Sequence, residues 1–321
     1  MFRLTRISIF SIALFSFVLI TADAVSAQLR LPRPSQKASV MQTIGVTDVT
    51  ITYHRPGVKG RKIYGDWPAD AKAPAGEGTL DDQNTRPPGA PIVPYGHMWR
   101  TGANEATQIT FTDDVLVGGQ PLAAGTYSLH TVPGKDEWTV IFNGTANQWG
   151  SFSYSADKDL LRIKTKPVAV PDNQEWLAFQ IEPTAANAAR VNIRWEKLSV
   201  PFTVEVKDVT ATALARARTA VAAAKPDDWT TPFQAANYAK ANKAPDEATR
   251  WFDQALKAID EQIKTKPNFQ NYTRRATTLL NAGKMQEALA AAEKALEVGK
   301  AEKADTAALE KRIADIKAGK P

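Results

Sequence analysis

Two patterns of apolar and polar residues divide the chain. Over residues 38–207 the two types alternate with a period of two, which is typical of strands that bury one face. The clearest strand-like runs lie at 49–53, 108–112, 126–131, 138–142, 160–163, 176–181, 191–195 and 200–206. Short strands with regular turns between them predict an antiparallel β-sandwich or jelly-roll-like domain, or a barrel of antiparallel strands.

Turn-forming residues separate these runs. Gly118-Gly119 and Pro133-Gly134 lie between predicted strands, and Asn143-Gly144 predicts a tight hairpin turn. Residues 68–91 are rich in Pro, Gly, Ala and Asp and hold almost no large apolar side chain, so we expect a flexible loop inserted in the β domain. No helical stretch of crossover length interrupts the strands, which argues against a parallel α/β sheet.

After residue 207 alanine-rich helix formers replace the alternation. Residues 208–228 predict a helical linker, and residues 229–321 contain a repeat in which apolar positions recur forty residues later. The first set is Ala248, Trp251, Phe252, Ala255 and Leu256, and the second is Ala288, Ala291, Ala292, Ala295 and Leu296. Gly283 predicts a turn between paired helices, and Leu309, Ile313 and Ile316 give a closing helix one apolar face. This pattern resembles the tetratricopeptide repeat, whose usual period is about 34; a helical hairpin bundle without a repeat is the alternative.

The N-terminal segment has the features of an export signal. Two arginines precede an apolar run at 7–20, and small residues end at Ala27. This pattern predicts a signal peptide over residues 1–27, removed before Gln28, and then a linker over residues 28–37. The alternative, an uncleaved membrane anchor, needs about 20 apolar residues, which is more than the run provides. We therefore expect a mature chain without a membrane span.

Charge and cysteine content limit the classes of function. The formal net charge is +6, and the charges are scattered without a block of one sign, so we expect no nucleic-acid partner. The chain has no cysteine, which excludes disulfides, thiol catalysis and cysteine-ligated metals. An exported protein without disulfides indicates a bacterial envelope, with the protein either periplasmic or secreted.

Two segments of the predicted β domain are dense in polar residues that carry chemistry. They are residues 53–62 (YHRPGVKGRK) and 93–107 (VPYGHMWRTGANEAT). Together with the later Ala-Gly-Thr-Tyr element that ends at Tyr127, these motifs resemble a bacterial domain-of-unknown-function family, number 2911, over residues 35–207. Tetratricopeptide-like tails are familiar on such proteins, so the resemblance implies the fold class given above. The family has no established activity, and the 68–91 insert and the histidines at 54 and 130 depart from its pattern.

These segments supply the candidate ligand-binding residues, which are Arg55, Arg61, His97, Arg100, Asn104 and Glu105. The planar donors of arginine suit carboxylate or phosphate groups, so one interpretation is a pocket for an anionic or sugar-like ligand. The other interpretation is structural: an Arg100–Glu105 ion pair would tie loops across the mouth of the sandwich.

The three histidines lack the short spacing of metal ligands, so we predict no metal and no cofactor. The sequence favours a ligand- or protein-binding module whose helical repeats dock a protein partner. The alternative is a hydrolase that acts on a small or glycan substrate through Arg100, Glu105 and a histidine. Whether the protein is an enzyme stays open at this point.

Overall fold

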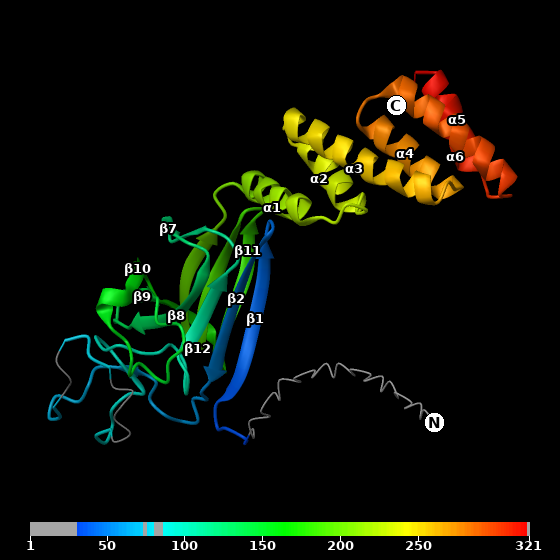
Figure 1. Ribbon diagram of the computed structural model, residues 1–321. Coiled ribbons are helices and arrows are strands. Elements are labelled where there is room, and N and C mark those ends of the chain that lie inside the picture. The colour runs from blue at the N-terminus through cyan, green and yellow to red at the C-terminus, as the bar shows by residue number, and fades with distance from the viewer. Residues whose placement is uncertain (1–30, 73–75, 80–85, 320–321) are drawn as a thin grey trace, which may run out of the picture. The chain divides into compact units, whose positions relative to one another are not determined.

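A computed structural model describes residues 31–72, 76–79 and 86–319 (Figure 1). The chain forms two units, residues 1–34 and residues 35–321, and the strands and helices belong to the second unit. The predicted signal peptide lies outside the described residues. So do residues 73–75 and 80–85 of the predicted flexible loop. No helix in the described part of the chain has both the length and the apolar character needed to cross a membrane.

The larger sheet has six strands, all antiparallel to their neighbours. In spatial order they are β1 (Gln36–Ile44), β2 (Thr47–Arg55), β5 (Thr107–Phe111), β8 (Gly125–Val132), β9 (Trp138–Asn143) and β10 (Asp159–Thr165). β1 begins two residues before the predicted start of the domain, since Gln36 and Lys37 pair with the end of β2.

A second antiparallel sheet has four strands. Its order is β11 (Val168–Ala185), β12 (Ala188–Glu205), β6 (Val115–Val117) and β7 (Gln120–Leu122), and a separate parallel pair joins β3 (Tyr64–Gly65) to β4 (Val93–Pro94). The two strands predicted at 191–195 and 200–206 are one strand, β12. Pro201 does not break it because the β12 register leaves β11 after Ser199 and joins β6 at Val204, so no ladder needs an N–H between them.

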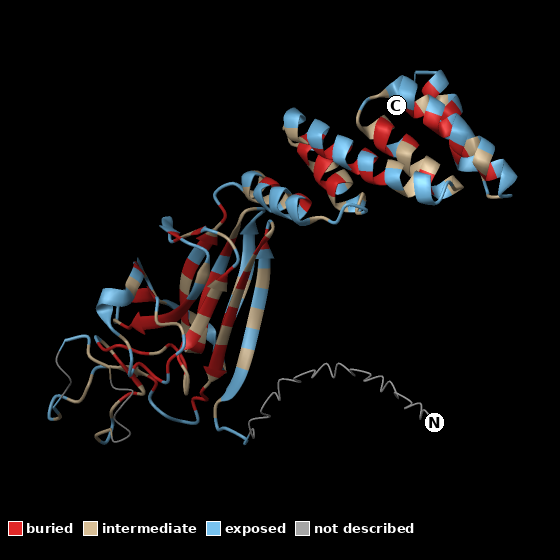
Figure 2. Ribbon diagram, in the orientation of Figure 1, coloured by how far each residue is buried: buried red, intermediate tan, exposed pale blue. Residues whose placement is uncertain are grey.

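The two sheets share one hydrophobic core. Ile51 of β2, Leu129 of β8 and Ile193 of β12 are all buried within it. Trp99 stacks on Trp195 with ring centroids 5.8 Å apart. Figure 2 shows buried residues along the strands; the buried residues that it shows on the helices belong to separate clusters. The fold is therefore the predicted antiparallel sandwich followed by helices, and the described strands form no closed barrel.

Six helices follow in the described part of the chain. They are α1 (Val209–Ala223), α2 (Thr230–Ala241), α3 (Pro245–Thr265), α4 (Phe269–Asn281), α5 (Met285–Ala301) and α6 (Ala307–Lys317). The alanines singled out by the repeat lie buried between helices; Ala255, Ala288 and Ala295 are fully enclosed. Small side chains at these positions let neighbouring helices approach closely.

Three helix ends share one turn geometry. Lys243, Gly283 and Lys303 all have positive φ, at 58°, 80° and 55°. In each case the next residue donates its N–H to a carbonyl in the last helical turn, the pairs being Ala244 to Ala239, Lys284 to Leu279 and Ala304 to Gly299, each at 2.9 Å. This is the Schellman pattern of helix termination. The first two turns are forty residues apart, which is the spacing of the apolar positions in the sequence.

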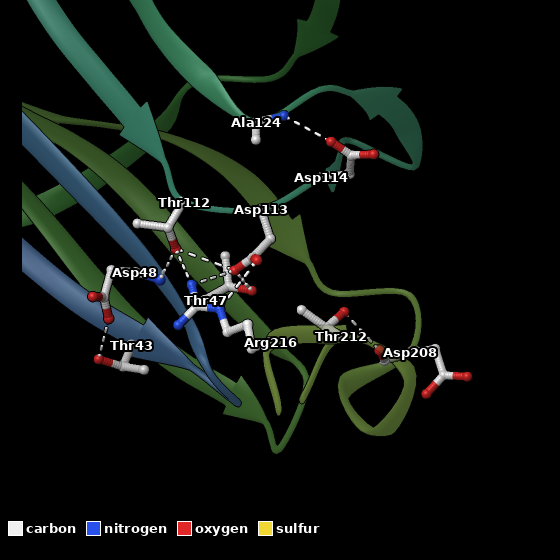
Figure 3. A network of polar contacts seen from close by, with 10 residues as sticks. All are labelled: Thr43, Thr47, Asp48, Thr112, Asp113, Asp114, Ala124, Asp208, Thr212 and Arg216. Carbon is white, nitrogen blue, oxygen red and sulfur yellow. Dashed lines mark hydrogen bonds and ion pairs between the residues drawn. The ribbon is translucent and has the colours of Figure 1, made fainter. Parts of the chain in front are cut away.

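Helix α1 contacts the β domain through a polar network (Figure 3). Arg216 donates from Nη2 to Asp113 Oδ2 at 2.6 Å and to Thr112 Oγ1 at 2.7 Å. Thr47 donates to the same Asp113 oxygen at 2.8 Å. Val209, at the start of α1, packs against the β core, and a Cβ added to Gly45 would lie 2.6 Å from it. The predicted helical linker is thus bound to the sandwich.

Candidate functional site

A pocket of about 380 Å³ lies on the face of the six-stranded sheet that points away from the core. Thr52, His54 and Gln108 form its floor, because they alternate along β2 and β5 with core residues. The complete lining is Lys37, Thr52, His54, Glu105, Ala106, Gln108, Asn147, Gln148 and Trp149. Four segments that lie far apart in the sequence therefore converge on one concave surface.

The strand register places polar side chains in a row beneath this surface. Thr52 pairs with Gln108, Gln108 with Ser128, and Ser128 with Asn143. Ser128 and Asn143 are fully buried even though they face away from the hydrophobic core. This part of the sheet is thus covered on both faces, and the row of side chains beneath the second covering is polar.

The second covering is a long connection, so the hairpin turn predicted at Asn143-Gly144 is wrong. β9 ends at Asn143, whereas β10 begins only at Asp159. The buried Asn143 side chain donates to Asp159 Oδ1 at 2.8 Å and to the Ser155 carbonyl at 2.9 Å. It holds the two ends of residues 144–158 together while the segment between them crosses the sheet. Gln148 in that segment donates to Ser128 Oγ at 3.3 Å.

Glu105 is carried by a loop with unusual backbone geometry. Thr101 has a φ of 53°, in a region that a β-branched residue rarely adopts, and Asn104 has a φ of 59°, which asparagine tolerates. Thr101 is fully buried, and its carbonyl accepts a hydrogen bond from Thr107 Oγ1 at 2.8 Å. Arg100 donates from Nη1 to the Asn104 carbonyl at 2.7 Å. Such conformations persist only where the surroundings enforce them, and they concentrate at functional sites.

Gly102 lets the loop lie directly against β2. A Cβ at this position would come within 2.9 Å of Thr107 Oγ1 and 3.3 Å of the His54 carbonyl. The loop also pairs with the covering segment, since the Ala106 N–H donates to the Gln148 carbonyl at 3.0 Å and the Gly150 N–H donates to the Asn104 carbonyl at 2.9 Å. The backbone on both sides of Glu105 is therefore fixed.

At the pocket floor His54 Nε2 lies 3.5 Å from Glu105 Oε2. The His54 side chain is buried, whereas the Glu105 side chain is 45% exposed. The carboxylate thus contacts the imidazole and also lines the pocket. No group of three or more His, Asp or Glu side chains within residues 31–72, 76–79 and 86–319 is arranged to hold a metal ion.

The structure distributes the predicted site residues over different places. Only Glu105 lines the pocket, and Arg100 and Asn104 shape its loop. Arg55 donates to the Leu177 carbonyl at 2.8 Å, and Arg61 donates to the Gly57 carbonyl at 2.5 Å. Both guanidinium groups therefore hold backbone outside this pocket.

His97 is also outside the pocket. Its ring lies 6.3 Å from that of Trp67, and burial lowers its pKa. The Arg100–Glu105 ion pair stays a prediction, and the structure places His54 Nε2 next to the Glu105 carboxylate.

Sequence reasoning missed most of the lining. Lys37 lay in the predicted linker, and Thr52 and Gln108 were only the polar partners of an alternation. The signal that could have found Thr52 and Gln108 is their shared outward phase on strands adjacent in the sheet. The strand register is needed to show that these two outward-facing residues lie next to each other.

The fold and the site define an antiparallel β domain with a polar pocket on its outer face, followed by paired helices. The chain belongs to the family described as "Protein of unknown function (DUF2911)", whose profile matches residues 35–204. That span includes every residue of the pocket lining. No curated protein matches the chain.

Proposed function

We propose that the β domain is a binding module for a small polar ligand, which occupies the pocket between the sheet and the covering segment. The observation that carries this proposal is the convergence of four sequence segments on a concave volume of about 380 Å³. Ligand pockets are concave and largely pre-formed, with a few polar groups that orient the ligand. The strained loop that fixes Glu105 supplies such pre-formation.

The lining favours a ligand with both donors and acceptors. Lys37 offers an ammonium group and Glu105 a carboxylate, so the opposite charges balance. The lining also has three carboxamide side chains, each with an NH2 donor and a carbonyl acceptor; they are Gln108, Asn147 and Gln148. A purely apolar compound would leave these groups without partners, and a highly charged one would lack matching charge.

Filling the pocket should abolish binding without altering the rest of the sheet. We expect calorimetry with a panel of neutral sugars, polyols, amino acids and dicarboxylates to find a compound that binds the wild type. Thr52→Trp should weaken its binding by about tenfold or more, because the indole occupies the floor. Thr50→Trp is the matched control, since Thr50 is the next outward position on β2 and does not line the pocket. A panel without a binder, or equal binding by all three proteins, would contradict the proposal.

A hydrolase is the second candidate, and the His54–Glu105 contact is the observation that favours it. A histidine next to a carboxylate in an accessible pocket can take a proton from water during attack on a substrate. Binding and hydrolysis share the pocket but differ in outcome. Hydrolysis predicts that the bound compound is converted to products and that His54→Gln abolishes conversion while Thr50→Trp does not.

We extend the proposal to the helices, which we infer to dock a protein partner. The support is the repeated Schellman turn at Lys243 and Gly283 and the buried alanines that recur at the same spacing. Repeated helix pairs bury their core between neighbours and present an extended surface on the outside. The tetratricopeptide-like character of the tail belongs to this proposal.

The remaining part of the proposal is export to the bacterial envelope. Its support is the sequence of residues 1–27, with an apolar run too short to span a bilayer. Isolation of the protein from the envelope of its host tests export and docking together. We expect an N-terminus at Gln28 and a co-isolated protein that is lost when the chain ends after Ala223. A product that keeps Met1 would contradict export, and a partner retained by the shortened chain would contradict docking.

A further inference from the structure

We propose that the ligand of this pocket is a neutral saccharide, with one sugar ring stacked on the indole of Trp149 and its hydroxyl groups bound by the amide and carboxylate side chains of the lining. This inference rests on the proposed binding function and names the class of ligand.

The exposure of Trp149 is the first observation. Its relative exposure is 49%, whereas Trp99, Trp138 and Trp195 of the same domain are buried at 5% or less. A large aromatic side chain gains most of its stabilisation from burial, so exposing half of it in a pocket is costly for the protein alone. The cost is recovered if a ligand covers the ring.

The placement of Trp149 is the second observation. Its backbone forms a bridge with Glu105, and the hydrogen bonds from Ala106 to Gln148 and from Gly150 to Asn104 lie on either side. The platform is thus attached to the same strained loop that carries the carboxylate. A ligand meets an aromatic face and a polar cluster whose backbones are already fixed, so little ordering free energy is lost on binding.

The polar groups of the lining match hydroxyl groups. Gln148 is buried, and its Nε2 donates to the Thr145 carbonyl at 2.9 Å. Its Oε1 is buried without a hydrogen-bond partner among the described residues. A buried acceptor left in this state costs free energy, which a hydroxyl donor entering the pocket, directly or through a bound water, would offset.

Hydroxyl groups also suit the neighbouring side chains. Gln108 uses Nε2 to donate to the Ala146 carbonyl at 3.0 Å, so its Oε1 is the atom that remains to accept from a ligand. The half-exposed Glu105 carboxylate accepts as well, and Lys37 donates. A sugar ring offers apolar C–H groups on its face and hydroxyl groups that both donate and accept around its edge. Free amino acids and dicarboxylates offer no comparable face for the indole.

The test uses the full chain and isothermal titration with neutral disaccharides, namely maltose, cellobiose, lactose and di-N-acetylchitobiose, with succinate and glutamate as charged comparators. We expect one disaccharide to bind. Trp149→Ala should weaken its binding by about tenfold or more, and Trp149→Phe should recover part of the loss because the phenyl ring keeps a smaller stacking face. Phe152→Ala is the matched control, since Phe152 is an exposed aromatic residue of the same segment that does not line the pocket.

The outcomes separate the two levels of the proposal. Binding of succinate or glutamate but of no disaccharide, lost in Thr52→Trp, would keep the binding function and overturn the saccharide inference. Disaccharide binding that Thr52→Trp abolishes and Trp149→Ala leaves unchanged would overturn the stacking arrangement. If no probe binds, or if disaccharide binding survives Thr52→Trp, the proposed function itself fails. Melting curves of all variants establish that each is folded.

Discussion

Between pH 6.5 and pH 4 the wild-type protein is expected to lose about 3 kcal/mol of unfolding free energy that a His130→Leu variant does not lose. His130 lies on β8 and is fully buried. Burial, and secondarily the nearby Arg100 guanidinium, lower its pKa from the ordinary 6.5 to about 4, while the Ser128 backbone acts weakly in the opposite direction. Each unit of pKa difference corresponds to about 1.36 kcal/mol.

The sign follows from proton binding in the two states. Below pH 6.5 the unfolded chain protonates this histidine, whereas the folded protein keeps it neutral until about pH 4. The unfolded state therefore binds more protons across this window, so the free energy of unfolding falls as the pH falls. Above pH 6.5 both states are neutral at this position, and the histidine contributes no pH dependence.

The groups that face His130 make the effect specific. The Tyr154 ring lies 5.0 Å away, but its hydroxyl donates to Asp159 at 2.7 Å, and burial and that carboxylate raise the pKa of the phenol, so it stays neutral. Arg100 contributes a positive charge that opposes a second one.

The measurement is urea unfolding of the wild type and of His130→Leu at several pH values from 7.5 to 4. Leucine is chosen because Met98, Val132 and Ile141 form an apolar cluster with Tyr154, the residue that the His130 ring contacts. A His97→Leu variant serves as the comparison, because burial lowers the pKa of His97 in the same direction and from a separate place. Parallel pH profiles for the wild type and His130→Leu would show that His130 is not the group that titrates.

The alternation of apolar and polar residues predicted the sandwich, but it could not show which residues lie together in the pocket. The alternation at 49–53 gave β2 correctly, because inward and outward positions follow from the pleat alone. The dipeptide Asn143-Gly144 favours a tight turn in general. Here the Asn143 side chain is buried instead and donates to Asp159 and to the Ser155 carbonyl. Whether Asn143 forms a tight turn or this buried contact depends on Asp159, which lies sixteen positions away in the sequence.

Arg55 and Arg61 show that residue type alone does not identify what a side chain binds. Arg55 and Arg61 have the planar donors expected of an anion site, yet backbone carbonyls satisfy them. A carbonyl of a distant strand accepts as well as a carboxylate does, and residue type does not distinguish the two. Glu105 was found because its motif is long and specific. The contact of Glu105 with His54 could not be predicted, because it depends on how closely the Gly102 loop approaches β2, which only the three-dimensional structure shows.

A chain that ends after Lys207, the predicted boundary of the β domain, should fold but should be about 2–4 kcal/mol less stable than a chain that ends after Ala223. The longer chain keeps α1, which packs the partly buried Val209 against the β core next to Gly45. It also keeps Arg216, which donates through two nitrogens to Asp113 and also to Thr112 (Figure 3).

The contribution of the ion pair itself is moderate, because the Arg216 side chain is 42% exposed and solvent screens it. Two point variants in the longer chain separate the contributions. Arg216→Ala should remove about 1 kcal/mol, because Asp113 then keeps only its bonds from threonines. Arg218→Ala should change nothing in this chain, since its partner Glu247 belongs to α3 and is absent from it.

The stabilities of the two truncated chains and of the two point variants are measured by urea unfolding, monitored by the fluorescence of the buried tryptophans. Leu214 and Val221 of α1 pack with residues of α2 and α3 rather than with the sheet, so their exposure in the longer chain leaves the β core intact. Equal midpoints and slopes for the two truncated chains would show that α1 adds nothing to the sandwich. Unfolding of the shorter chain in the absence of urea would show that the β domain extends through α1, and the boundary would move from residue 207 to about residue 224.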